Sequence, residues 1–254
     1  DLDQIDFSND IKSYYSGPIT DVNTFKPSYS SNDRTRSFLK VQDGCDYNCT
    51  FCTIPLARGK SRNASIKKTV NLAKDISRTN AKEIVLTGVN IGDFGKGTEE
   101  NFYDLIKQID NNVDIERIRI SSIEPNLLTD EIIEFCFSSK KFMPHFHIPL
   151  QSGSDRMLKS MKRRYTTSLY SDRLNKIKNF DQNACIGADV IVGHPTESDE
   201  DFLETYNFLK NNDVSYLHVF TYSERENTEA INLEPAVPCS ERSRRSRILR
   251  ELSD

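Results

Sequence analysis

The strongest constraint on the fold is an alternation between six short apolar runs and segments with helical periodicity. We expect strands at residues 38–41, 83–88, 117–121, 145–150, 186–193 and 216–221. Between two of these runs, Phe102, Leu105, Ile106 and Ile109 follow the i, i+3, i+4, i+7 spacing of a helix with one buried face. Strands that alternate with helices form parallel βαβ units, and right-handed crossovers curl such a sheet. The sequence therefore predicts an α/β fold, a barrel or part of one.

Local signals place further helices. Ile66, Val70 and Ala73 mark one helix, and Thr129 precedes another. Ser198, followed three residues later by an aspartate, resembles a capping box. The Arg-rich tail at 241–254 reads as a terminal helix whose arginines either contact phosphates or stay solvated.

The bulk properties exclude some classes of protein. The chain has 254 residues, a formal net charge of −4 and a sequence pI of about 5.7, so its overall charge gives no sign of nucleic-acid binding. No apolar run approaches the ~20 residues of a membrane span. The acidic first ten residues lack the apolar region of a signal peptide. We therefore expect a cytoplasmic protein that makes no membrane contact.

Three cysteines crowd into one short loop directly after the first expected strand. Cys45, Cys49 and Cys52 have the spacing C-x3-C-x2-C, which in such a chain indicates metal ligands rather than disulfides. Three thiolates can hold three corners of a [4Fe–4S] cluster and leave the fourth iron open. The alternative is a zinc site, which normally needs four ligands. A spatially remote ligand, such as His145 or His147, could complete it. The remaining alternative is that the three cysteines are plain thiols.

The spacing, with an aromatic residue before the last cysteine, resembles the signature of the radical S-adenosylmethionine (SAM) superfamily. The resemblance implies that the open iron binds the methionyl amine and carboxylate of SAM, and that reductive cleavage of SAM yields a 5′-deoxyadenosyl radical. It also implies that Phe51 lies along the adenine of SAM. The fold expected from it is the partial TIM-type (β/α)6 barrel of radical SAM enzymes.

Further segments, from about residue 34 to 253, resemble methylthiotransferases, which insert a methylthio group at a C–H bond, usually on adenosine 37 of tRNA. These segments are Val41–Cys45, Pro55–Gly59, Val85–Asn90, Ser122–Pro125, Pro149–Asp155 and Asp189–Gly193. His145–Pro149, Lys162–Tyr165 and the short Arg58–Arg62 loop resemble the branch that modifies C2 of N6-threonylcarbamoyladenosine. The alternatives are the branches for isopentenyladenosine or a ribosomal-protein aspartate, and a catalytically silent iron–sulfur or RNA-binding fragment.

The family resemblance also implies a domain organisation. We expect residues 1–37 to be an entry segment from an N-terminal domain that carries a second [4Fe–4S] cluster. Residues 38–235 would form the radical SAM core, and 236–254 a helix leading to an RNA-binding domain. The expected partners are tRNA, at the anticodon loop, and an electron donor such as flavodoxin.

Seven further residues are candidates for SAM binding. They are Thr87, Gly88, Glu124, Gln151, Ser152, Arg164 and Val192. The resemblance implies that Thr87 and Gly88 support the methionyl amine of SAM. Gln151, Ser152 and Glu124 close expected strands, at the carboxyl ends where such barrels place their chemistry.

Structural alternatives exist for most of these candidates: a plain Gly-rich turn for Thr87 and Gly88, a surface carboxylate for Glu124, and a helix cap at Ser154 with ordinary turn polarity after strand four. Arg164 belongs to a basic run, which either contacts the SAM carboxylate or a tRNA phosphate or forms a solvated face. The run consists of Lys159, Lys162, Arg163 and Arg164.

Two other features carry expectations. His145 and His147 alternate with apolar residues, so both are expected to face the barrel interior, either as structural histidines or in contact with the substrate or SAM. Gly193-His194-Pro195-Thr196-Glu197 departs from the family's Gly-Phe-Pro-Gly-Glu. Threonine resists backbone shapes that glycine permits, so this loop is expected to differ locally.

Overall fold

The computed structural model describes residues 17–22, 24–30 and 35–253, and all six expected strands form. They are β2 (Arg36–Lys40), β5 (Glu83–Thr87), β6 (Arg117–Ile120), β7 (His145–His147), β8 (Cys185–Val192) and β9 (Tyr216–Thr221). Strands β2, β5 and β6 run parallel in that order, as do β7, β8 and β9. The parallel bridges Ile118–Phe142 and Ser122–His147 join the two groups. In the described residues no pairing closes β9 onto β2, so the predicted partial (β/α)6 barrel is confirmed.

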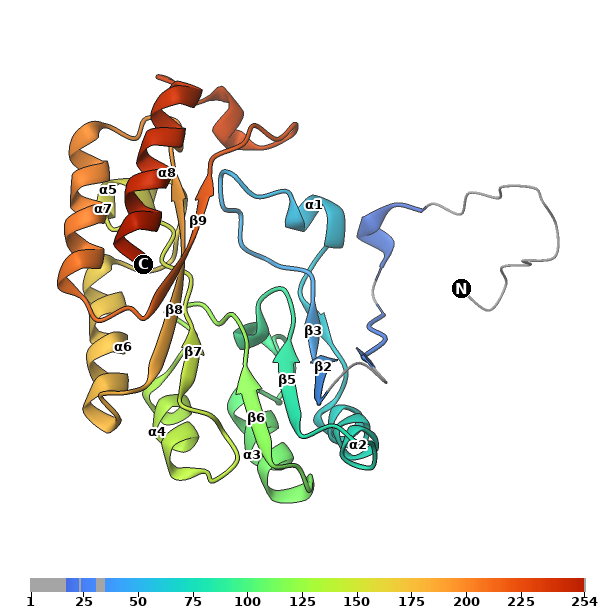
Figure 1. The fold of residues 1–254 in the computed structure, drawn as a ribbon. Coiled ribbons are helices and arrows are strands. Elements are labelled where there is room, and N and C mark those ends of the chain that lie inside the picture. Colours follow the sequence, from blue (N-terminus) through green and yellow to red (C-terminus); the bar gives the residue numbers. More distant parts are fainter. Residues whose placement is uncertain (1–16, 23, 31–34, 254) are drawn as a thin grey trace.

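Most of the helices cover the outer face of this curved sheet (Figure 1). They are α2 (Ile66–Ser77), α3 (Phe102–Asn112), α4 (Asp130–Ser138), α5 (Asp155–Ser160), α6 (Thr167–Phe180), α7 (Asp199–Asn211) and α8 (Cys239–Ser253). The short helix α1 (Ile54–Arg58) lies instead beyond the strand ends (Figure 1), and single 3-10 turns occur at η2 (Ile19–Asp21), η3 (Ile91–Asp93) and η4 (Glu229–Asn232). Ser198 and Asp201 form the expected capping box of α7. Among the described helices, none combines the length and apolar character needed to cross a bilayer.

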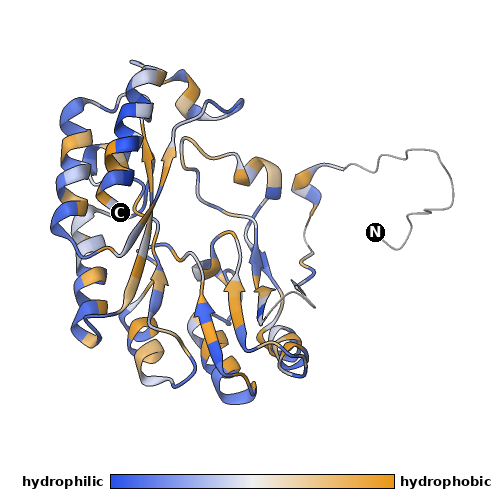
Figure 2. Cartoon of the chain, in the orientation of Figure 1, coloured by the Kyte–Doolittle hydropathy of each residue, from blue (hydrophilic) through white to orange (hydrophobic). Residues whose placement is uncertain are grey.

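Residues along each strand alternate between the helix-covered core and the barrel lumen. Ile118 on β6, Phe146 on β7 and Val190 on β8 are almost completely buried among apolar side chains. Their neighbours, such as Arg119 and His147, are only half-buried. Hydrophobic residues accordingly occur along strands such as β5 and β9 and alternate with hydrophilic ones along the helices (Figure 2). The lumen is therefore the polar side of the sheet.

The strands differ most from expectation in two places. Strand β1 (Ser28–Tyr29) pairs antiparallel with β2, so part of the expected entry segment 1–37 lies on the sheet. Residues 1–16, 23 and 31–34 of that segment lie outside the described residues, and its role as a linker stays a prediction. Strand β7 ends at His147 rather than at residue 150, because Pro149 has no N–H to donate to the neighbouring strand.

Candidate functional site

The cysteine loop lies at the carboxyl end of the first parallel strand. A short ladder between β3 (Gln42–Asp43) and β4 (Arg62–Asn63) brackets the loop and α1. Gly44 opens the loop with φ of 73°, and a Cβ there would lie 2.0 Å from the carbonyl oxygen of Lys60. Only glycine therefore fits this turn, since it lacks the Cβ and tolerates positive φ.

Gln42 ties the cysteine loop to the Gly-rich turn after β5. Its side chain is completely buried. Its Nε2 donates to the carbonyl oxygens of Asp43 (3.0 Å) and Gly44 (2.7 Å), and lies 2.9 Å from Oγ of Ser61. Its Oε1 accepts from the backbone N–H groups of Val89 (3.0 Å) and Asn90 (2.8 Å). One amide thus sets the relative position of two loops, a role that the sequence analysis missed.

The three thiols fit the ligand set of an iron–sulfur cluster better than that of a single ion. Within the described residues, only His147, Asp189 and His218 place three candidate ligand atoms within 4.8 Å of one another. The sulfurs of Cys45, Cys49 and Cys52 are therefore spread more widely than around one zinc ion, where Zn–S bonds of about 2.3 Å hold sulfurs about 4 Å apart. Neither His145 nor His147 joins them, which removes the zinc alternative in the form expected.

Burial keeps the three thiols neutral without iron. It raises the pKa of Cys45 to about 11 and raises the pKa values of Cys49 and Cys52. Backbone N–H groups of Tyr47 and Ile54 point at the sulfurs of Cys45 and Cys52, each at 3.4 Å. Binding iron must therefore release protons, after which these donors stabilise the thiolates.

Arg163 joins the cysteine loop to Glu124, which follows β6. Its Nη1 donates to Sγ of Cys49 at 3.0 Å, and its Nη2 pairs with the Glu124 carboxylate. The Arg163 side chain is only 4% exposed. Burial raises the pKa of Glu124, while Arg163 opposes that shift. Arg163 had been expected only within a basic run, so its position beside the cysteines is a finding of the tertiary structure.

Phe51 and Gln151 come together in one pocket of about 320 Å³. The pocket lies between the cysteine loop and the ends of β8 and β9, and Asp189, Ile191 and Tyr222 also line it. Gln151 has φ of 63°, which turns the chain at the end of the β7 segment. Thr87 and Gly88 lie on the other half of the barrel, where a Cβ on Gly88 would approach the Gln42 carbonyl oxygen to 2.8 Å.

Three other candidate SAM-binding residues do not line this pocket, although Arg164 contacts the cysteine loop, where its Nη2 donates to the carbonyl oxygen of Asp46 at 3.2 Å. Ser152 is completely buried, and its hydroxyl lies 3.1 Å from Oγ1 of Thr205 on helix α7. Val192 is completely buried on the core face of β8. Arg164 is exposed and lies over the ring of Tyr47, with its Cζ 3.9 Å from the ring centroid. Backbone atoms of Ser152 and Val192, rather than their side chains, remain near the strand ends.

The loop after β8 shows the local effect of the threonine in place of glycine. Thr196 has φ of 71°, a left-handed conformation that is strained for a β-branched residue. Glu197, which follows it, is buried and accepts a hydrogen bond from the Gly193 N–H at 2.7 Å. Arg245 on α8 pairs with the same carboxylate at 2.6 Å.

The Arg-rich tail is therefore partly structural. Arg242 and Arg245 are buried on α8 and pair with Glu224 and Glu197. Arg247 is 72% exposed.

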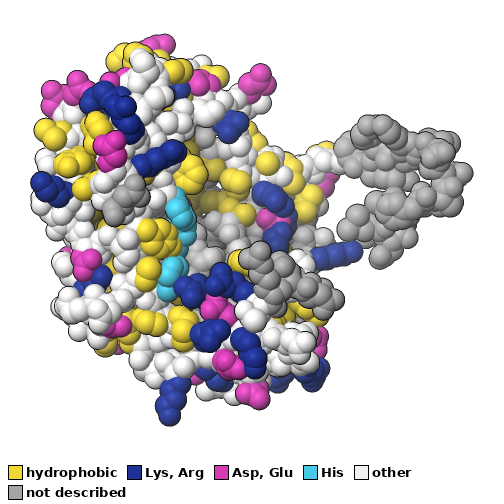
Figure 3. Space-filling view, in the orientation of Figure 1, with side chains coloured by type: hydrophobic (Ala, Val, Ile, Leu, Met, Phe, Trp, Pro, Cys, Tyr) yellow, Lys and Arg dark blue, Asp and Glu magenta, His cyan; other side chains and the backbone are white. Residues whose placement is uncertain are grey.

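Histidine side chains lie along a hollow between the two sets of strands, with lysine and arginine side chains beside its lower end (Figure 3).

Comparison with known proteins places the chain in a family. Residues 39–209 match the radical SAM superfamily. The chain is 45% identical over 224 residues to threonylcarbamoyladenosine tRNA methylthiotransferase MtaB of Bacillus subtilis, covering 87% of this chain and 50% of that protein. It is 38% identical over 223 residues to the MtaB protein of Thermotoga maritima, covering 87% and 51%. The chain thus spans about half the length of these relatives.

Solved structures share the fold at low identity. Coproporphyrinogen III oxidase HemN from Escherichia coli, a radical SAM enzyme, superposes with a TM-score of 0.59 and 15% identity, covering 85% of this chain and 50% of that chain. The radical SAM methyltransferase TsrM from Kitasatospora setae, with a bound [4Fe–4S] cluster, gives a TM-score of 0.63 at 11% identity, covering 76% and 38%.

Proposed function

Because this chain belongs to the radical SAM superfamily, we propose that it is the catalytic core of a tRNA methylthiotransferase acting on C2 of N6-threonylcarbamoyladenosine 37. The observation that carries the proposal is the similarity over most of the chain to MtaB proteins of five bacteria, at 36–45% identity. A tRNA-2-methylthio-N(6)-dimethylallyladenosine synthase from Clostridium tetani is 35% identical over 80% of the chain. The threonylcarbamoyl branch is therefore the better-supported one.

Cys45, Cys49 and Cys52 would hold a [4Fe–4S] cluster, which with SAM supplies the electron transfer and radical chemistry of this superfamily. The donor set fits, since three thiols occupy one loop and no fourth thiol or imidazole among the described residues completes a compact site. Arg163 would offer a positive charge beside Cys49, and the N–H groups of Tyr47 and Ile54 would stabilise the other two thiolates.

Phe51 and Gln151 would bind the adenosyl part of SAM in the pocket that they share. Thr87 and Gly88 would bind the methionyl amine through the turn that Gln42 holds in place. Glu124 is oriented by Arg163 and would face the same cofactor. For Ser152 and Val192 we propose backbone contacts only, because both side chains are buried in the core. Arg164 would reach a phosphate or the SAM carboxylate only by leaving the ring of Tyr47.

The partners belong to the same proposal. The substrate would be the anticodon loop of tRNA, and electrons would come from a flavodoxin-type donor in the cytoplasm. A second [4Fe–4S] cluster, held by an N-terminal domain as in the family that the sequence resembles, would handle the sulfur. None of the three dispersed cysteines of this chain lies in a group of three candidate ligands among the described residues.

Nucleoside mass spectrometry tests the proposal. Total tRNA from a strain lacking the gene would be compared with that from strains complemented by the full-length gene carrying either wild-type Cys49 or Cys49→Ala. We expect the 2-methylthio form of threonylcarbamoyladenosine to vanish in the deletion strain, its precursor to accumulate, and only the wild-type gene to restore the product. Loss of a different methylthio nucleoside would retain the radical SAM assignment and reject the substrate.

A further inference from the structure

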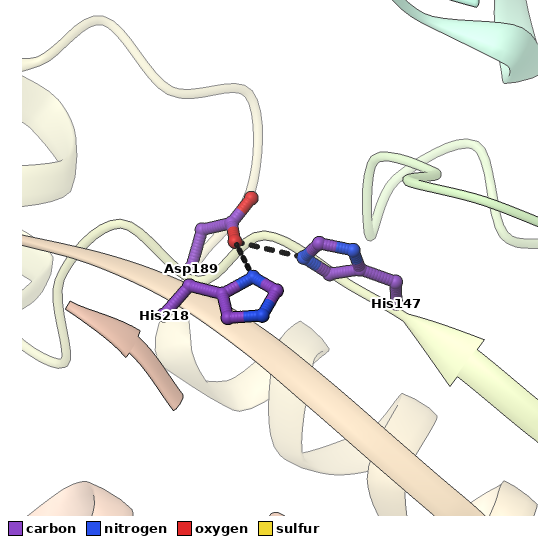
Figure 4. Close-up of side chains that lie close together, drawn as sticks. All are labelled: His147, Asp189 and His218. Carbon is purple, nitrogen blue, oxygen red and sulfur yellow. Dashed lines mark hydrogen bonds and ion pairs between the residues drawn. The ribbon is translucent and has the colours of Figure 1, made fainter. Parts of the chain in front are cut away.

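Three polar side chains from three neighbouring strands meet in the barrel lumen. His147 on β7 lies with its Nε2 2.8 Å from Oδ1 of Asp189 on β8, and Nδ1 of His218 on β9 lies 3.1 Å from the same oxygen (Figure 4). An ionised carboxylate only accepts hydrogen bonds, so both imidazole rings donate to it. We call these three residues the lumen trio.

Ring contacts hold the trio in place, but some of its polar atoms have no hydrogen-bond partner. The rings of His147 and His218 meet edge to face, with centroids 5.2 Å apart, and the Tyr216 ring packs against both. Within the described residues, no hydrogen bond engages Oδ2 of Asp189 or the second nitrogen of either ring. An acceptor oxygen and two imidazole nitrogens therefore remain open to a ligand. Because the described contacts already satisfy the shared oxygen, the arrangement needs no metal ion to explain it.

The trio adjoins the pocket proposed for SAM. Asp189 lines that pocket together with Phe51 and Gln151. It stands three residues before Val192, the last residue of β8, and thus about 10 Å below the carboxyl end of the strand at 3.3 Å per residue. A group bound to the trio would therefore extend from the cofactor level into the lumen.

The lumen below the trio carries excess positive charge. Glu83 on β5 is surrounded by three arginines: Arg36 at 2.8 Å, Arg119 at 3.3 Å and Arg117 at 3.4 Å. One carboxylate cannot neutralise three guanidinium groups. Arg119 also contributes to lowering the pKa of His145, after the larger effect of burial, so its charge acts on the strand that carries the trio. An anionic group in the lumen would be stabilised electrostatically.

The open polar atoms of the trio and the positive charge of the lumen would distinguish N6-threonylcarbamoyladenosine from N6-isopentenyladenosine. In adenine, C2 and the carbon that carries N6 flank N1, so a base whose C2 faces the cofactor holds its N6 substituent to the side of the cofactor, where it could reach the adjoining trio. A threonylcarbamoyl group brings ureido N–H donors, a hydroxyl and a carboxylate. An isopentenyl group brings none of these, and it would bury the trio's open polar atoms without partners, at a cost of about 1–3 kcal/mol for each.

We propose that His147, Asp189 and His218 bind the N6-threonylcarbamoyl group of the substrate nucleoside and select it over an isopentenyl group. A ureido N–H would donate to Oδ2 of Asp189, and the open nitrogen of His218, whose other nitrogen donates to Asp189, would accept a hydrogen bond from the hydroxyl. The inference rests on the proposed function, since it concerns the substrate of the same reaction.

The test uses the reconstituted full-length enzyme and anticodon stem-loop RNAs carrying either threonylcarbamoyladenosine or isopentenyladenosine at position 37. The measured quantity is the ratio of the two kcat/KM values. His218→Phe keeps an aromatic ring but removes the polar atoms, and we expect it to lower the ratio at least ~30-fold, since sites built for hydrogen bonding reject analogues strongly. Asp189→Asn, which keeps the side-chain shape, serves as a second variant and should lower the ratio as well.

His145→Phe is the matched control. His145 is the preceding lumen-facing residue of β7, it bonds Tyr216 at 3.1 Å, and it lies outside the trio. The ratio of the two kcat/KM values in His145→Phe should stay within about threefold of the wild-type ratio, the range of ordinary substitutions outside a site. If His218→Phe lowers kcat/KM equally on both RNAs, the residue has a structural role and the inference is overturned. The inference is also overturned if the wild-type enzyme holds one equivalent of a divalent metal other than iron and the variant does not. A wild-type enzyme acting only on the isopentenyl RNA would reject the proposed function itself.

Discussion

The buried ion pair between Arg245 and Glu197 can be tested against an exposed arginine on the same helix. Arg245 on α8 and Glu197 after β8 have side chains that are 4% and 1% exposed, with Nη1 and Oε2 2.6 Å apart. Arg245→Met would leave the Glu197 carboxylate buried with a single donor, the Gly193 N–H at 2.7 Å. Removing one partner of a buried pair typically costs about 3–5 kcal/mol.

We expect the lower end of that range, because the Gly193 bond remains and the carboxyl group can take up a proton. A loss of ~3 kcal/mol corresponds to a fall of about 1–1.5 M in the urea midpoint if the slope is about 2–3 kcal/mol per M. The chain has no Trp, so far-UV circular dichroism is the suitable probe. Arg247→Met removes an arginine that is 72% exposed and 3.9 Å from Glu251, and should change stability by less than ~0.5 kcal/mol.

The pH dependence gives the second readout. Burial raises the folded-state pKa of Glu197 above its ordinary 4.5, and Arg245 opposes that shift, so the variant raises this pKa further. A carboxyl group with a raised folded pKa destabilises the fold as pH rises above 4.5, where the unfolded chain ionises first. The deficit of Arg245→Met should therefore shrink from pH 7.5 toward pH 5, by about 1.4 kcal/mol per pH unit at most. Equal urea midpoints for the two arginine variants, or a deficit independent of pH, would contradict a buried ionised pair.

Three further substitutions test the site and its supports. Thr196→Gly should raise the free energy of unfolding by about 0.5–1 kcal/mol, because the relief of left-handed strain exceeds the entropy that glycine adds to the unfolded chain; an unchanged or lower urea midpoint would count against strain at φ of 71°. Gln42→Leu should lower the free energy of unfolding by at least ~2 kcal/mol, since it leaves buried backbone groups of two loops unpaired. It should also lower the iron content after desalting. Full iron retention would show that the two loops keep their positions without the Gln42 amide. Cys52→Ala should abolish both the cluster absorbance and the formation of 5′-deoxyadenosine, whereas Cys239→Ala, at an exposed position, should match wild type in both measurements.

The periodicity of the sequence was sufficient to predict the fold class. Six apolar runs form strands near the expected positions, and the helices predicted around 66–73, 102–109, after 129, after 198 and at 241–254 also form, because strand and helix spacing are local properties of the chain. Helix α6 between β7 and β8 was not predicted. The cysteine loop is equally local, with its three thiols and the obligatory glycine within nine residues of one another. The sequence also marked the loop after β8 as unusual from its threonine, but that Thr196 adopts a left-handed conformation was visible only in the structure.

Side-chain direction at the strand ends was decided by the tertiary structure. Both Arg163 and Arg164 contact the cysteine loop, but it is Arg163 that reaches the Cys49 thiol, whereas Arg164 lies over the Tyr47 ring. Lys162, with φ of 56°, turns the chain after α5 just before the two arginines. Ser152 likewise points to Thr205 on helix α7. A shift of one residue reverses which face a side chain occupies, and sequence spacing does not resolve this at a turn.

In the lumen trio, too, one part was predictable from local sequence and another part depended on the tertiary structure. His147 was expected to face inward from its alternation with apolar neighbours, and its half-buried position agrees with that pattern. Its partners Asp189 and His218 lie 42 and 71 residues later in the chain, and only the parallel register of β7, β8 and β9 brings the three together. Local spacing thus determined which elements form and which residues lie on one face. Strand register, which depends on long-range backbone pairing, decided which of those residues meet.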